Sequence, residues 1–201
     1  MKKNFLDEEK NYKEEINKYF NNYIPIKFDK LQQEYNITIY GCDFTTITKI
    51  KGIDKNIISM IRFKEDEIKL YYNNNYNLDV KEQRFILANL VAELEKMKSK
   101  ERKPILKEYD LILKCDEPFD NMSMEEYKEY LCNNIARQIL MPKKLYDRLY
   151  TIFSNNLEEE KLIELLSTLF VVPTREIVIR GKELGYKFDI DYLNAKTRKL
   201  V

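Results

Sequence analysis

Histidine is absent from this chain of 201 residues, and glycine, proline and cysteine are scarce. Without imidazole, neither a histidine-ligated zinc site nor a histidine general base can form. The three cysteines have neither metal-site spacing nor the even count of a disulfide framework. We expect reduced core or boundary thiols, since no imidazole is present to activate a cysteine nucleophile. These residues are Cys42, Cys115 and Cys132.

The chain also lacks a strong charge of either sign and any long apolar run. Lysine and arginine number 35 against 34 aspartates and glutamates, a net charge of +1, so no global positive field indicates nucleic-acid binding. No apolar run approaches the roughly 18 residues of a membrane span. The first ten residues contain no apolar segment typical of a signal peptide. We therefore expect a cytoplasmic protein of one domain, with no membrane partner.

The first 80 residues contain patterns for both helices and strands. Apolar residues at fourfold spacing predict a helix over about 8–20, which Pro25 ends. β-Branched and apolar runs predict short strands, and a polar asparagine tract predicts a loop. The expected elements are a short helix at 28–35, strands at 37–40, 57–63 and 68–72, a turn at 64–67 and a loop at 73–77.

A helix beginning after Asp79 presents two polar residues beside its apolar face. Asp79 and Glu82 have the spacing of a capping box. Asn89 and Glu93 lie about 40° apart on the helical wheel and flank the apolar arc. A charged loop is expected next, with prolines 104 and 118 as helix breakers. The apolar arc consists of Ile86, Leu90, Leu94 and Met97.

A second capping box, Ser123 with Glu126, predicts a helix that ends at about Leu140. Glu129 projects into the same sector as apolar residues of this helix, and Asn133 follows one turn later. Burying a carboxylate is costly unless it has a partner, so Glu129 requires one. The apolar arc of this helix comprises Leu131, Ile135, Ala136 and Ile139.

Three shorter helices are expected over about 142–153, 157–170 and 174–184, with Gly185 as a left-handed C-cap. The last two resemble a helix-turn-helix, which leaves DNA binding as one alternative. The final helix carries Arg175, Arg180 and Lys182, but its apolar residues favour packing on the body of the protein. Those apolar residues are Ile177, Val178 and Ile179.

Three separated segments share the pattern of a known family. Residues 84–93 read Arg-Phe-Ile-Leu-Ala-Asn-Leu-Val-Ala-Glu, after an extended segment and a polar loop. Residues 129–142 keep an Asn, an Ala and a closing Ile-Leu-Met-Pro in register, and residues 169–185 contain Phe-Val-Val, Arg180 and a Leu-Gly pair. Over about residues 27–186 the chain resembles the ImmA/IrrE-like metallopeptidases.

The resemblance implies an α+β, zincin-like fold with a small β-sheet and a helix-turn-helix-like C-terminal region. In that family two histidines and a glutamate bind zinc. Only the acid is retained, as Glu129, whereas Asn89 and Glu93 replace the histidines and Leu90 replaces the catalytic glutamate. Asn133 would support the pocket. The resemblance thus implies a pseudopeptidase with no catalytic residue, no metal and no cofactor.

Two interpretations of the altered site remain open. Asn89, Glu93 and Glu129 all offer oxygen donors, which Mg²⁺, Mn²⁺ or Ca²⁺ prefer, and a peptidase with such a non-standard metal is one alternative function. In the other interpretation, Asn89 and a protonated or lysine-paired glutamate hydrogen-bond across the pocket.

Members of this family are often encoded on prophages and mobile elements, and several cleave helix-turn-helix repressors. We therefore expect a regulator that binds a protein partner without cutting it. The candidate partner is a helix-turn-helix repressor or another mobile-element component, and nucleic acid is not the expected partner. The expected organisation is an N-terminal helical extension (1–26), a peptidase-like core (27–142) and a C-terminal helical region of the same domain (143–201).

Overall fold

The computed structural model describes residues 36–45, 56–64, 67–96, 104–115 and 120–188, together with 25, 27, 32 and 33. Within these residues the chain is a mixed α+β protein, with six α-helices and one mixed sheet of four strands. The α+β fold class expected from the sequence is therefore confirmed. The helix expected at 8–20 lies outside the described residues, as does most of the one at 28–35.

The sheet has the strand order β1-β3-β2-β4. β1 runs parallel to β3, whereas β2 is antiparallel to both β3 and β4. Leu70 of β3 is fully buried at the centre, where it pairs with Ile39 on one side and Ile61 on the other. The strands are β1 (Ile37–Cys42), β2 (Ile57–Phe63), β3 (Ile68–Asn73) and β4 (Ile105–Glu108).

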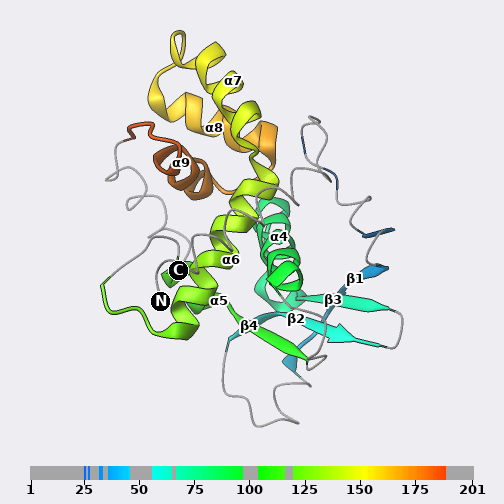
Figure 1. The fold of residues 1–201 in the computed structure, drawn as a ribbon. Coiled ribbons are helices and arrows are strands. Elements are labelled where there is room, and N and C mark those ends of the chain that lie inside the picture. Colours follow the sequence, from blue (N-terminus) through cyan, green and yellow to red (C-terminus); the bar gives the residue numbers. More distant parts are fainter. Residues whose placement is uncertain are drawn as a thin grey trace.

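Two 17-residue helices pack side by side next to the sheet (Figure 1). Helix α4 (Val80–Lys96) contacts β2 and β3 and packs along α6 (Met124–Leu140). The short helix α5 (Tyr109–Lys114) directly follows β4 and packs against α6. The facing sides of α4 and α6 thus form the centre of the molecule.

Three shorter helices lie at the end of α6 away from the sheet, at the top of Figure 1. They are α7 (Lys143–Ser154), α8 (Glu159–Phe170) and α9 (Thr174–Glu183). Gly185 has φ +91°, and the amides of Gly185 and Tyr186 bond back to the carbonyls of Lys182 and Gly181. This is a Schellman motif, so the predicted left-handed cap is confirmed.

One cluster of buried apolar side chains includes residues of the sheet, α4, α6, α8 and α9. It extends from Ile37 to Val178 in sequence, and the C-terminal helices therefore share the core of the sheet. A smaller cluster around Phe44, Ile57 and Met60 lies on the other face of the sheet.

The helix beginnings agree with the sequence only in part. Ser123 and Glu126 make both hydrogen bonds of a capping box at α6, as predicted. At α4, the Asp79 carboxylate accepts from the amides of Lys81 and Glu82, but the Glu82 carboxylate binds Arg175 instead. The ion pair of Glu82 with Arg175 thus replaces the hydrogen bond that Glu82 would accept from the backbone amide of Asp79 in a complete capping box.

The largest error of the sequence analysis concerns the charged loop expected between α4 and α6. Strand β4 and helix α5 occupy residues 105–114 of that segment, and the asparagine tract expected as a loop contains a 3-10 helix over Asn74–Tyr76. A four-residue strand is too short for alternation of polar and apolar residues to identify it. Pairing with β2 stabilises it instead.

Candidate functional site: a buried lysine between two glutamates

Helix α4 positions three of the predicted site residues. Leu90 is fully buried in the main apolar cluster. Asn89 is also fully buried but points to a polar neighbourhood, and Glu93, one turn further on, keeps 19% of its side chain exposed. The core side of α4 is thus apolar at Leu90 and polar at Asn89 and Glu93.

Helix α6 supplies the facing side chains. The Asn89 amide nitrogen donates to Glu129 Oε1 at 2.7 Å and to Asn133 Oδ1 at 2.8 Å. Asn133 in turn donates to the carbonyl oxygens of Ile112 and Cys115 at 2.8 and 3.2 Å. The structure thus brings Asn89, Glu129 and Asn133 together, and Asn133 connects them to helix α5.

A lysine that the sequence analysis did not single out completes the cluster. Lys107 of β4 extends its ammonium between the two glutamates, 2.7 Å from Glu93 Oε2 and 2.7 Å from Glu129 Oε2. The Cys132 thiol donates to Glu93 Oε2 at 2.9 Å, and its sulfur lies 3.7 Å from the ammonium. Both Lys107 and Cys132 are buried. Glu129, the carboxylate that required a partner, therefore pairs with Lys107 of strand β4.

The electrostatics of the cluster keep Lys107 charged. Burial by itself favours the neutral amine, but the sulfur of Cys132 and the carboxylates of Glu129 and Glu93 favour the ammonium more strongly. The pKa of Lys107 is therefore raised above its ordinary value. One ammonium facing two carboxylates leaves the cluster with a single net negative charge.

The residues present do not fit the zinc ion that active members of the resembled family bind. Each glutamate has an oxygen bonded to Lys107, and the Asn89 amide donates its protons toward the position where a metal ligand would have to offer a lone pair. In the part of the chain that the structure describes, no group of three or more His, Cys, Asp or Glu residues could hold a metal ion. The Lys107 ammonium lies between the two carboxylates instead.

Two buried side-chain oxygens at this site lack a hydrogen-bond partner among the described residues. They are Ser59 Oγ and Asn89 Oδ1. Ser59 is the cross-strand neighbour of Lys107 in the β2–β4 ladder, and side chains of paired residues point to the same face. Both oxygens thus belong to the surroundings of Lys107, where unpaired polar atoms are costly.

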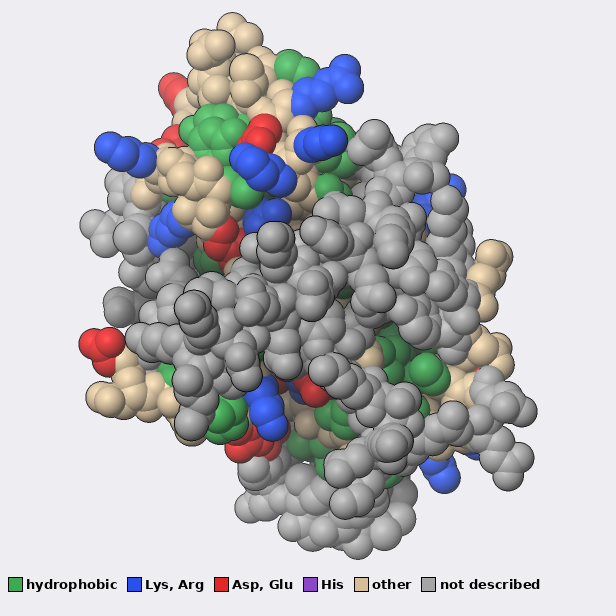
Figure 2. Space-filling model, in the orientation of Figure 1, with side chains coloured by type: hydrophobic (Ala, Val, Ile, Leu, Met, Phe, Trp, Pro, Cys, Tyr) green, Lys and Arg blue, Asp and Glu red, His purple; other side chains and the backbone are tan. Residues whose placement is uncertain are grey.

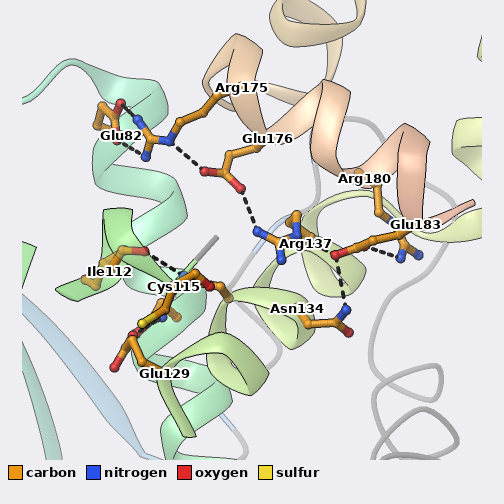
Figure 3. Close-up of polar contacts among 12 residues, drawn as sticks. Glu82, Ile112, Cys115, Glu129, Asn134, Arg137, Arg175, Glu176, Arg180 and Glu183 are labelled. Carbon is orange, nitrogen blue, oxygen red and sulfur yellow. Dashed lines mark hydrogen bonds and ion pairs between the residues drawn. The ribbon is translucent and has the colours of Figure 1, made fainter. Parts of the chain in front are cut away.

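A second polar cluster connects α4, α9 and α6 (Figure 3). Arg175 of α9 binds both carboxylate oxygens of Glu82, at 2.6 and 3.0 Å, and donates to Glu176 at 2.9 Å. The other oxygen of Glu176 accepts from Arg137 of α6 at 3.2 Å, and both side chains are fully buried. Arg137 also donates to Glu183. This chain of ion pairs positions α9 against the two long helices.

Two of the three basic residues of α9 on which the DNA-binding alternative depends have internal partners. Arg175 forms the ion pairs described above, and buried Arg180 donates to the Met141 carbonyl and to Glu183. The apolar face of α9 is buried as the sequence predicted. On the face drawn in Figure 2, basic side chains over the upper helices alternate with acidic and apolar ones.

The turn between α8 and α9 is held by α4. Val171 has φ 54°, a conformation that is strained for a β-branched residue. Arg84 donates to its carbonyl oxygen at 3.2 Å, and Lys81 donates to Ser167 at 2.7 Å. Ser167 itself donates to the Val172 carbonyl. These contacts hold the turn between α8 and α9 against α4.

Neither a comparison with protein-family models nor a search of curated proteins finds a match for this chain. Among the described helices, none is long and apolar enough to cross a membrane.

Proposed function

We propose that this chain is a catalytically inactive, zincin-like relative of the ImmA/IrrE metallopeptidases that regulates by binding a protein partner. The candidate partner is a helix-turn-helix repressor or another component of a mobile element. The observation that carries the proposal is the position of the Lys107 ammonium between Glu93 and Glu129. Hydrolysis of the family's kind needs a metal-bound water, and an ammonium paired with both glutamates supplies none.

The neighbouring side chains support the same conclusion. Glu129 uses one oxygen for Asn89 and the other for Lys107, so its carboxylate is committed to internal contacts. Leu90 is buried and cannot accept a proton. The contacts among Asn89, Glu93, Lys107 and Glu129 therefore hold α4, α6 and β4 together. A protein partner would bind to the surface around this cluster.

A binding experiment with a helix-turn-helix repressor encoded beside this gene tests the proposal. We expect a stable complex by calorimetry and size-exclusion chromatography, with the repressor intact by mass spectrometry after prolonged incubation. An unrelated helix-turn-helix protein serves as the control and should not bind. Absence of a complex would contradict partner binding.

A cleavage assay on the same mixture tests the absence of hydrolysis. Repressor fragments that disappear with Glu129→Gln, together with stoichiometric metal in the purified protein, would show a working peptidase. That result would favour the oxygen-ligated metal alternative over the binding protein. We expect no fragments from either the natural chain or the variant.

A further inference from the structure

The two edges of the sheet differ in their protection against a further strand. β4 lies at one edge and β1 at the other (Figure 1). β4 has four residues and turns the charged side chain of Lys107 into the protein, and both features discourage strand addition. β1 has six residues, pairs with β3 without a bulge and contains neither a charged residue nor a proline. The β1 edge thus lacks the features that protect β4.

Half of the backbone groups of β1 point away from the sheet. The Ile68 amide of β3 donates to the Asn36 carbonyl at 3.1 Å, and successive residues of a strand direct their backbone groups to opposite sides. Every second residue from Asn36 onward therefore bonds to β3, and each residue in between directs an amide and a carbonyl outward. No described strand pairs with that side of β1. The outward-facing residues are Ile37, Ile39 and Gly41.

The side chains beside this edge are neutral or paired. Tyr40 is 38% exposed and stacks on Tyr71 of β3 at a ring distance of 5.4 Å. The Thr38 hydroxyl donates to Glu67, which forms an ion pair with Lys69 at 3.2 Å. Lys69 also lies over the Tyr40 ring. The described charges that contact β1 side chains are thus of opposite sign and bound to each other, so an identical edge meets no uncompensated like charge.

We propose that β1 pairs antiparallel with β1 of a second copy of this chain, so that two four-stranded sheets join across a two-fold axis. Two-fold dimers are the commonest protein oligomers, and the same surface serves on both sides. An uncharged edge without a bulge or a proline meets this requirement, because each copy offers the other the same row of amides and carbonyls.

One register uses every outward-facing group. It is centred on Ile39, which pairs with Ile39 of the second copy, while Ile37 pairs with Gly41 on either side. Each such pair exchanges two backbone hydrogen bonds, which gives about six across the interface. The same register places Tyr40 opposite Thr38 of the second copy as a non-hydrogen-bonded pair, with Cα atoms about 4.5 Å apart.

Dimerisation is independent of the repressor binding proposed above, because it is measured on the isolated full-length chain. Sedimentation equilibrium of the natural chain at rising concentration should show twice the mass of the chain. A single monomeric species at every concentration would overturn the proposal. A monomer that still binds a repressor would leave the proposed function standing, so the two failures are distinguishable.

A charge placed on the edge should separate the two copies. In Tyr40→Lys the new ammonium faces Lys69 of the second copy, since Lys69 is the strand neighbour of Thr38. Like charges across an interface cost several kcal/mol, so the dissociation constant should rise more than about tenfold. Tyr40→Phe is the matched control and should stay dimeric. An unchanged dimer in Tyr40→Lys would refute pairing through β1.

A proline tests the backbone bonds directly. Ile39→Pro removes an outward amide and leaves the bonds to β3 in place, so it should give a monomer, whereas Ile39→Val should remain dimeric. Circular dichroism shows whether the proline variant is folded. A folded Ile39→Pro dimer would contradict the proposal, and if that variant does not fold, Tyr40→Lys decides because its side chain is exposed.

Disulfide formation tests the register. Chains carrying Thr38→Cys or Tyr40→Cys, each combined with Cys42→Ser, are oxidised separately and as a mixture. Residues directly opposite each other lie within disulfide reach, whereas diagonal neighbours are about 7–8 Å apart. We expect covalent dimers only in the mixture. Covalent dimers of Tyr40→Cys alone, or none in the mixture, would overturn the register centred on Ile39.

Discussion

Replacing Lys107 by methionine should destabilise this protein severely. The substitution keeps a long side chain but removes the positive charge between Glu93 and Glu129. The side chains of Lys107 and Glu129 are only 6% and 5% exposed, so water screens the remaining charges poorly. Removing one partner of a buried ion pair costs about 3–5 kcal/mol. Because Glu93 is 19% exposed and can turn toward water, we expect a loss of about 3 kcal/mol.

The measurement is urea unfolding followed by far-ultraviolet circular dichroism, with a chelator present to remove metal. Lys161→Met is the matched control, since Lys161 is 65% exposed and pairs with Glu158 on the surface of α8. Exposed pairs contribute about 0–1 kcal/mol, and the control should stay within that range. A loss below about 1 kcal/mol for Lys107→Met would refute the buried-charge reasoning.

A double variant separates charge from packing. Combining Lys107→Met with Glu129→Gln removes the second buried charge, and the glutamine carbonyl can still accept from Asn89. Replacing both partners of a buried ion pair is often neutral, so at least about 2 kcal/mol of the loss should return. If stability does not return, the loss came from packing around the lysine stem.

Three further outcomes are expected. The pKa of Lys107 is raised on folding. The stabilisation that its charge gives the folded chain is therefore complete at pH values below about 10.5, the pKa of lysine in the unfolded chain. Above that pH, the natural chain should lose about 1.4 kcal/mol per pH unit relative to Lys107→Met in unfolding titrations. Glu176→Gln should cost about 1.5–3 kcal/mol by urea unfolding, because fully buried Arg137 loses one charged partner but keeps its ion pair with Glu183; exposed Glu158→Gln should change stability by under about 0.5 kcal/mol. Ser123→Ala should cost about 1 kcal/mol through loss of the α6 cap, and an unchanged unfolding midpoint would contradict that role.

The chain's local patterns determined most of its regular structure. The three strands before residue 74 and the five longer helices lie within a few residues of the predicted positions. Their signals are local: runs of β-branched residues, apolar periodicity, a serine cap and a glycine after the last helix. The absence of histidine likewise excludes one class of metal site whatever the fold is.

Only the tertiary structure decided which residue pairs with the buried glutamate of α6. The sequence indicated that Glu129 needed a partner, but 22 residues separate it from Lys107 along the chain. Lys107 lies in a four-residue strand whose existence depends on pairing with β2. Similarly, Glu82 pairs with Arg175, 93 positions away along the chain, instead of completing the cap of α4. Such contacts depend on three-dimensional proximity, which no local pattern of apolar and polar residues records.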